Sequence, residues 1–160
     1  MSKINPRLPL LTVNAAARLR GFTLIELLVV IAIIGLLSTL SVLALNTARA
    51  RARDAKRVAD VKQIQTALEM YYNDVGSYPA TASVAAGAAI STTNGVYLSV
   101  VPTPPTPFDF TTGNCVGQPE YTYTADGLAP YSTYHINYCL GAQTGGVSAG
   151  AKTATPAGIQ

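Results

Sequence analysis

The chain has 160 residues, 49% of them hydrophobic and 12% charged, with a formal net charge of +3. Four of its eleven basic residues precede Gly21, so the chain after that glycine carries seven basic and eight acidic residues, a net charge of −1. This balance does not indicate a nucleic-acid-binding protein, and the length leaves room for one small domain rather than a large catalytic core.

Residues 1–21 are expected to be a leader peptide rather than part of the folded protein. They are basic, contain no acidic residue and are interrupted by Pro6 and Pro9, which favours a targeting segment. An ordinary secretory signal is the competing interpretation. The apolar run that follows is too long for the core of such a signal and contains a glutamate, so we prefer a membrane segment.

Residues 22–45 are predicted to form a transmembrane and assembly helix. These 24 residues contain a single charged side chain, Glu26, and as a helix they would be about 36 Å long, enough to cross a hydrocarbon layer of about 30 Å. A charge at the bilayer centre costs roughly 2.5–3.5 kcal/mol, and less near the interface. Glu26 therefore either extends towards the headgroups or has a partner.

The sequence around this glutamate resembles the start of the type IV pilin and pseudopilin family. The resemblance lies in a glycine, an aromatic residue, Thr-Leu-Ile-Glu and a long Leu/Val/Ile run, from Gly21 to about Ala44. It implies that a prepilin peptidase cleaves after Gly21 and that Phe22, the new N-terminal residue, is N-methylated. It also implies that Glu26 is the filament-assembly carboxylate, which meets the N-terminal ammonium of a neighbouring subunit.

Residues 46–75 are predicted to continue the helix as an amphipathic segment, because they contain no proline or glycine. The apolar positions recur at spacings of three and four: Val58, Val61, Ile64, Leu68, Tyr71, Tyr72 and Val75. Gly76 and Pro79 then indicate the helix end. We interpret the apolar stripe as the face that packs against a domain. The basic cluster Arg49–Arg57 is interpreted as a solvated or headgroup-contacting collar rather than a nucleic-acid site.

Residues 76–140 are expected to form a small globular β domain on the long helix, which gives an α+β, pilin-like fold. Residues 80–95 are compatible with either a short helix or a surface loop. Glu120–Ala125 and Tyr131–Leu140 alternate in the manner of two antiparallel strands. Residues 141–160 are rich in glycine, alanine and threonine, and are expected to be a mobile or loosely packed tail.

Cys115 and Cys139 are the only cysteines. They could be two unrelated thiols, a zinc site short of ligands beside His135, or a disulfide, which a small extracytoplasmic domain favours. No partners around His135 form a catalytic triad, so neither an enzyme nor catalytic residues are expected. Calcium would find only Asp109 and Asp126 as side-chain ligands, so no metal or cofactor is expected.

The resemblance implies a prepilin, the structural subunit of a type IV pilus-like filament that serves adhesion, motility or uptake. Its partners would be the prepilin peptidase, copies of itself, minor pilins, a membrane assembly platform and the lipid bilayer, with nucleic acid disfavoured. One alternative is a pseudopilin of a type II secretion-like system, and a more distant one is a membrane-anchored binding module that does not assemble.

The resemblance also implies a location. The precursor would cross the cytoplasmic (inner) membrane once, with its C-terminal domain outside, before it enters an extracellular or periplasmic filament. Counting positive charges alone gives the opposite orientation, because four basic residues precede the apolar run and six follow it within about 20 residues. We give priority to the resemblance, since the peptidase of this family acts at the cytoplasmic side.

Overall fold

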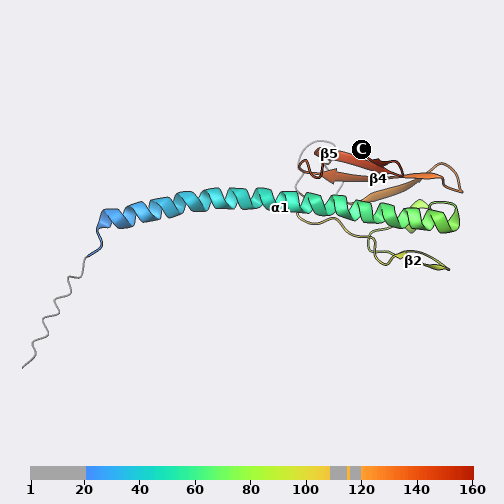
Figure 1. The fold of residues 1–160 in the computed structure, drawn as a ribbon, viewed down its shortest axis with the longest axis horizontal. Helices are drawn as coiled ribbons and strands as arrows, with labels where there is room; N and C mark the ends of the chain where they lie inside the picture. The colour runs from blue at the N-terminus through green and yellow to red at the C-terminus, as the bar shows by residue number, and fades with distance from the viewer. Residues whose placement is uncertain (1–20, 109–114, 116–119) are drawn as a thin grey trace, which may run out of the picture. The chain divides into compact units, whose positions relative to one another are not determined.

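A computed structural model describes residues 21–108, 115 and 120–160 (Figure 1). Apart from Gly21, the expected leader lies outside the described residues, and so does Asp109. The chain divides into two compact units, residues 1–40 and 41–160, and each is described by itself. The elements are α1 (Leu24–Val75), the 3-10 helix η1 (Thr81–Ser83), β1 (Ile90–Thr92), β2 (Gly95–Leu98), β3 (Thr122–Asp126), β4 (Thr133–Leu140), β5 (Gly150–Thr155) and β6 (Gly158–Ile159).

The described part of the first unit is helical from Leu24 onward. Its apolar side chains are all exposed, and none of this stretch is buried against other parts of the chain. By length and composition the helix could cross a membrane. A helix with apolar side chains on every side is typical of a membrane span or of a segment surrounded by partners.

In the second unit, α1 buries the face that the sequence predicts. Val58, Val61, Ile64 and Leu68 are all buried, whereas Val75 at the end of the helix is exposed. The helix ends at Val75 as predicted. Gly76 follows with a φ of +79°, and its N–H donates to the carbonyl of Tyr72 at 2.8 Å, which is the left-handed C-cap that glycine favours.

Two antiparallel sheets pack with this half of α1. β1 and β2 form a hairpin, and β3-β4-β5-β6 form a four-stranded sheet in chain order. The predicted alternation along β4 is present, because its alternate residues from Tyr134 to Leu140 are buried. They join the helix residues in one core, together with Ala154 of β5. The α+β fold is therefore confirmed.

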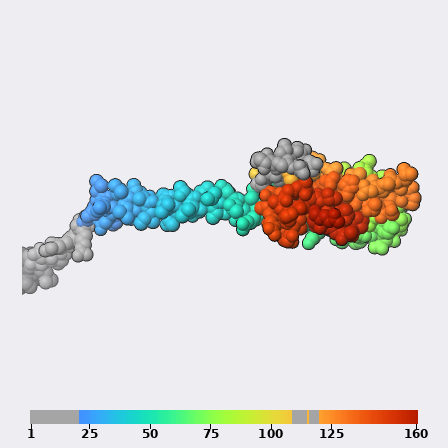
Figure 2. Space-filling view, turned by 90° about the horizontal axis from the view of Figure 1, so that it is seen from above, coloured from blue at the N-terminus to red at the C-terminus, as the bar shows by residue number. Residues whose placement is uncertain are grey.

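The expectation of a loosely packed tail over residues 141–160 is wrong. β5 pairs with β4 from Ala154↔Ile136 to Gly150↔Leu140, and β6 pairs in turn with β5. Figure 2 shows these C-terminal residues, in red, over a broad part of one face of the second unit. The segment 150–155 is weak in strand-forming side chains, so its pairing depends on β4 rather than on local preference.

Residues 80–95, for which the sequence allowed either a short helix or a surface loop, contain a short helix, a loop and a strand. The segment contains η1 and then β1, which pairs with β2 across the two-residue turn at 93–94. Small and polar residues dominate this stretch, and only Val84 and Ile90 reach the core. Two isolated apolar anchors give too little periodicity for a sequence-based assignment.

Candidate functional site

The carboxylate of Glu26 lies in the first turn of α1, where it forms a reciprocal cap with Thr23. Glu26 Oε2 accepts hydrogen bonds from the Thr23 backbone N–H at 2.8 Å and from the Thr23 hydroxyl at 2.7 Å. The Glu26 N–H in turn donates to Thr23 Oγ1 at 3.3 Å. This is the capping-box arrangement, which satisfies donors that the helix leaves without partners. The carboxylate also lies at the positive end of the helix dipole.

Gly21 and Phe22 precede the helix. Both are exposed, Phe22 to 76%, and a side chain added at Gly21 would meet no atom within 4 Å. The peptide bond between them therefore lies outside the helical hydrogen-bond ladder, where an enzyme can bind an extended chain. Phe22 and Glu26 also line one shallow hollow, together with Ile25, Val29 and Val30.

In the second unit, the carboxylates of α1 bind groups of the β domain. Three tyrosine hydroxyls donate to them at 2.9 Å, namely Tyr121 to Asp60, Tyr78 to Glu69 and Tyr97 to Asp74. Burial, and then the bond to Glu69, raises the pKa of Tyr78. Burial and the bond to Asp60 do the same to the pKa of Tyr121. The hydroxyls of Tyr78 and Tyr121 therefore stay protonated donors. All three tyrosine–carboxylate bonds fix the domain along the helix.

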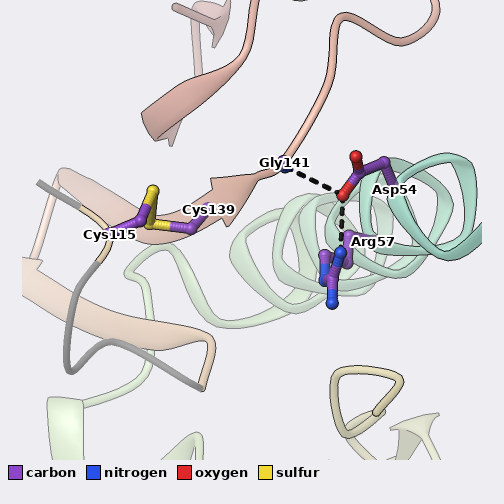
Figure 3. Close-up of a disulfide and its surroundings, with 5 residues drawn as sticks. All are labelled: Asp54, Arg57, Cys115, Cys139 and Gly141. Atoms are coloured by element: carbon purple, nitrogen blue, oxygen red, sulfur yellow. Dashed lines mark hydrogen bonds and ion pairs between the residues drawn. A yellow bond between two sulfur atoms is a disulfide. The ribbon is translucent and has the colours of Figure 1, made fainter. Parts of the chain in front are cut away.

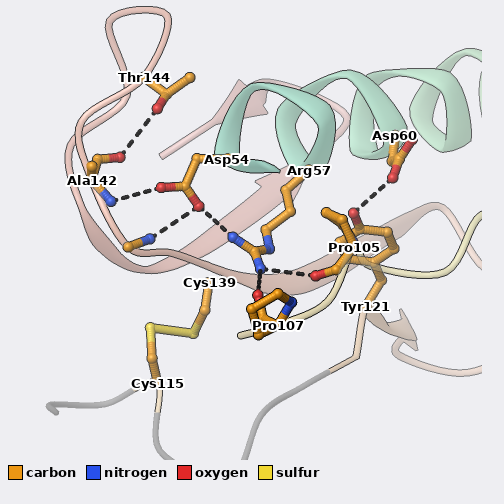
Figure 4. Close-up of polar contacts among 11 residues, drawn as sticks. Asp54, Arg57, Asp60, Pro105, Pro107, Cys115, Tyr121, Cys139, Ala142 and Thr144 are labelled. Atoms are coloured by element: carbon orange, nitrogen blue, oxygen red, sulfur yellow. Dashed lines mark hydrogen bonds and ion pairs between the residues drawn. A yellow bond between two sulfur atoms is a disulfide. The ribbon is translucent and has the colours of Figure 1, made fainter. Parts of the chain in front are cut away.

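The fourth carboxylate, Asp54, is fully buried and pairs with the buried Arg57 at 2.5 Å. Asp54 also accepts the backbone N–H groups of Gly141 at 3.1 Å and Ala142 at 2.8 Å. Arg57 Nη2 donates to the carbonyl of Pro105 at 3.0 Å (Figure 4). The interpretation of Arg57 as part of an exposed basic collar is therefore wrong, because Arg57 is buried and, together with Asp54, joins the helix to two distant segments.

Cys115 and Cys139 form a disulfide with their Cα atoms 5.7 Å apart. Cys139 lies in β4, two residues before Gly141, which binds Asp54 (Figure 3). The disulfide closes a loop over a sequence separation of 24 residues, which by chain entropy stabilises the fold by about 3 kcal/mol. The covalent link and the ion pair therefore secure the same end of β4.

The chemistry of an enzyme or a metal site is not assembled in the described part of the chain. His135 Nδ1 lies 2.7 Å from Asp126 Oδ1, and both side chains are partly exposed. Within residues 21–108, 115 and 120–160, no three His, Cys, Asp or Glu side chains are grouped to hold a metal ion. The arrangement supports packing and recognition rather than bond-making.

The sequence did not predict the role of the carboxylates on α1. Asp54 follows the run Arg-Ala-Arg-Ala-Arg, and an acid beside so many cations is the one local signal of a special environment. The tyrosine–carboxylate pairs join residues 9 to 61 positions apart. No spacing rule within a single element relates such residues, so no sequence pattern predicts these pairs.

Comparison with known proteins finds similarity over part of the chain. The family model "Prokaryotic N-terminal methylation motif" matches residues 17–42. The type II secretion system core protein G of Escherichia coli is 43% identical over 68 residues, which cover 42% of this chain and 47% of that protein. The fimbrial protein EcpC of Eikenella corrodens is 40% identical over 82 residues, 51% of this chain and 52% of that protein.

A second fimbrial protein, from Neisseria meningitidis serogroup B, is 34% identical over 82 residues, 51% of this chain and 48% of that protein. The chain thus spans about half the length of the curated relatives it matches. No solved structure gave a significant match. The family model thus covers the methylation motif and the first part of α1.

Proposed function

We propose that this chain, which by its N-terminal segment belongs to the type IV pilin and pseudopilin family, is a prepilin that polymerises into a filament. The family consists of structural subunits rather than enzymes. One observation carries the proposal: Glu26 and an exposed Gly-Phe bond lie at the start of a helix whose apolar side chains from Leu24 to Leu45 are all exposed. Such a helix needs either lipid or other helices around it.

Processing is the first step of this proposal. A prepilin peptidase would cleave between Gly21 and Phe22, and methylation would follow at the Phe22 nitrogen. The exposure of both residues and their position before α1 support this. Cleavage creates a new ammonium group four residues before Glu26, on a chain end that is otherwise apolar.

Assembly through Glu26 is the second step. The carboxylate of one subunit would accept the N-terminal ammonium of a neighbour, and the apolar stretches would pack together as the filament core. Opposite charges attract strongly at low dielectric, whereas either charge alone is costly there. The hollow lined by Phe22 and Glu26 supports the proposal, since it combines an apolar lining with a carboxylate.

The N-terminal apolar helix anchors the precursor in a membrane. We infer that this is the cytoplasmic (inner) membrane and that the β domain lies outside, before the subunit enters an extracellular or periplasmic filament. The disulfide between Cys115 and Cys139 supports this orientation, because disulfides persist in oxidising compartments. A membrane assembly platform and minor pilins would be further partners.

Two kinds of filament fit these observations. Relatives named as fimbrial proteins favour a pilus that serves adhesion, motility or uptake. Relatives named type II secretion system core protein G favour a secretion pseudopilus as the second candidate. A membrane-anchored binding module that does not assemble is the more distant alternative, and it gives no role to Glu26.

Intact-mass measurement and N-terminal sequencing of the protein from membranes of its host test the processing step. The expected product starts at Phe22 and carries one added methyl group. A chain that starts at Met1 in cells with an active peptidase would overturn the proposal and favour the plain anchor.

The assembly step is tested with Glu26→Ala. This variant should insert into membranes normally but yield no filaments in sheared or pelleted fractions. Ser38→Ala is a matched control in the same apolar helix, because the Ser38 hydroxyl bonds only the carbonyl of Ile34 within its own chain among the described residues. Normal filaments in Glu26→Ala would refute the assembly role.

A further inference from the structure

The charged side chains of α1 fall into two groups: those with partners in the β domain or on the same helix, and those outside such contacts. Its acidic residues from Asp54 onward all accept hydrogen bonds from the β domain. Two basic residues of the predicted collar are also engaged, because Arg57 pairs with Asp54 and Lys56 binds Asp60 at 3.0 Å. The part of the collar that remains outside these contacts lies closer to the apolar stretch.

Arg53 is half-buried and has an interaction of its own, so the exposed remaining part consists of Arg49 and Arg51. Both are exposed, and in the described part of the chain neither takes part in an ion pair or hydrogen bond. They follow the last residue of the apolar run, Leu45, by four and six positions. At 1.5 Å per residue they lie about 6 and 9 Å beyond it along the helix axis. The headgroup layer extends about 5–8 Å beyond the hydrocarbon core, so the backbone of Arg49 lies at this layer and that of Arg51 lies just beyond it.

The two arginines also lie on opposite sides of the helix. Successive residues of an α-helix are rotated by about 100°, so Arg49 and Arg51 are about 200° apart around the axis. One protein partner on one side of α1 could contact only one of them. A layer of phosphates surrounds a membrane helix on every side and can contact both, and long arginine side chains can extend to reach it.

We propose that Arg49 and Arg51 form a belt that binds the headgroups of anionic phospholipids. This inference rests on the proposed membrane span, and it adds a class of ligand to it. The belt fixes the depth of the helix in the bilayer while the subunit waits for assembly. Each basic residue near an anionic surface strengthens the association about fivefold.

Lipid selectivity of the full-length protein, reconstituted in phosphatidylcholine vesicles, tests the proposal. The probes are spin-labelled phosphatidylglycerol and spin-labelled phosphatidylcholine, and the readout is the fraction of each that the protein immobilises. We expect the wild-type protein to prefer phosphatidylglycerol. The double variant Arg49→Gln/Arg51→Gln should lose most of this preference, by up to about fivefold for each arginine.

Lys62→Gln is the matched control. Lys62 is an exposed cation of the same helix, but it lies eleven residues, or about 16 Å, beyond Arg51. That separation exceeds the screening length of about 8–10 Å at physiological ionic strength. Lys62→Gln should therefore keep the wild-type preference for phosphatidylglycerol. Salt at 0.5 M should weaken this preference in the wild type and in Lys62→Gln alike.

Three results would overturn the inference. A wild-type protein that resists alkaline extraction but shows no preference at low salt has no anionic-lipid belt. A loss of preference in Lys62→Gln equal to that of the double variant would show a diffuse charge effect. The double variant could also keep the wild-type lipid preference and self-associate more weakly. That result would show that the arginines bind carboxylates of a second copy rather than lipid headgroups. Failure to stay in the bilayer at all would refute the membrane span itself.

Discussion

Removal of the Asp54 carboxylate should strongly destabilise the β domain. Asp54→Ala leaves the buried Arg57 without its carboxylate partner, and it leaves the N–H groups of Gly141 and Ala142 without their acceptor. Breaking a buried ion pair from one side costs about 3–5 kcal/mol. A domain of this size has a total free energy of unfolding of about 5–15 kcal/mol, so the loss is a large part of it.

Urea unfolding of the full-length protein in detergent, followed by the near-ultraviolet circular dichroism of its tyrosines, measures this loss. The double variant Asp54→Leu/Arg57→Leu should be more stable than Asp54→Ala, since it removes both charges at once. Asp126→Asn is the control, because the Asp126–His135 pair is partly exposed and should contribute less than about 1 kcal/mol. A loss below 1 kcal/mol in Asp54→Ala would refute the role of the buried pair.

Three further outcomes are expected. Cys115→Ser/Cys139→Ser should lower the free energy of unfolding by about 3 kcal/mol, and equal urea midpoints for this variant and the wild type would contradict that. Burial raises the pKa of Tyr138 to about 12, above the value of about 10 in an unfolded chain. The stability that the protonated Tyr138 contributes to the fold is thus fully present below pH 10 and is lost as the pH rises from 10 to 12. In Tyr138→Phe, the free energy of unfolding should therefore fall less steeply with pH between 10 and 12 than in the wild type. An unchanged slope would count against burial of Tyr138 as the cause. Thr23→Val removes both hydrogen bonds that the Thr23 hydroxyl makes with Glu26. It should lower the local stability of the first helical turn in micelles by about 1 kcal/mol, measured by amide exchange, and unchanged exchange rates would argue against the cap.

The sequence predicts those elements whose pattern is strong and local. The stripe from Val58 to Leu68 and the alternation along β4 each repeat over several turns or residue pairs, and the structure buries both. The helix end at Val75 depends on a glycine that adopts a positive φ, which few other residues do readily. The cysteine pairing also agrees with the sequence-based preference.

The misses have a common physical cause. β5 consists of small and polar residues that are not strong strand formers, and it exists because the edge of β4 offers hydrogen bonds and a place for Ala154. Arg57 lies among other cations in the sequence but is buried in the fold. The deciding contacts are distant in sequence: β5 pairs with β4 at separations of 10 to 18 residues, and the carbonyls of Pro105 and Pro107 lie 48 and 50 residues from Arg57. No local pattern contains such contacts.

Among the acidic residues of α1, Glu26 differs from the rest in the groups that donate hydrogen bonds to its carboxylate. The four acids from Asp54 onward accept hydrogen bonds from the β domain, so a new partner for any of them would weaken the contact between helix and domain. In the described part of the chain, Glu26 accepts bonds from Thr23 alone, in its own helical turn. Exchanging these local bonds for those of another chain costs about one cap, roughly 1 kcal/mol. Glu26 is therefore the acid of this helix that can bind a neighbouring subunit and leave the fold intact.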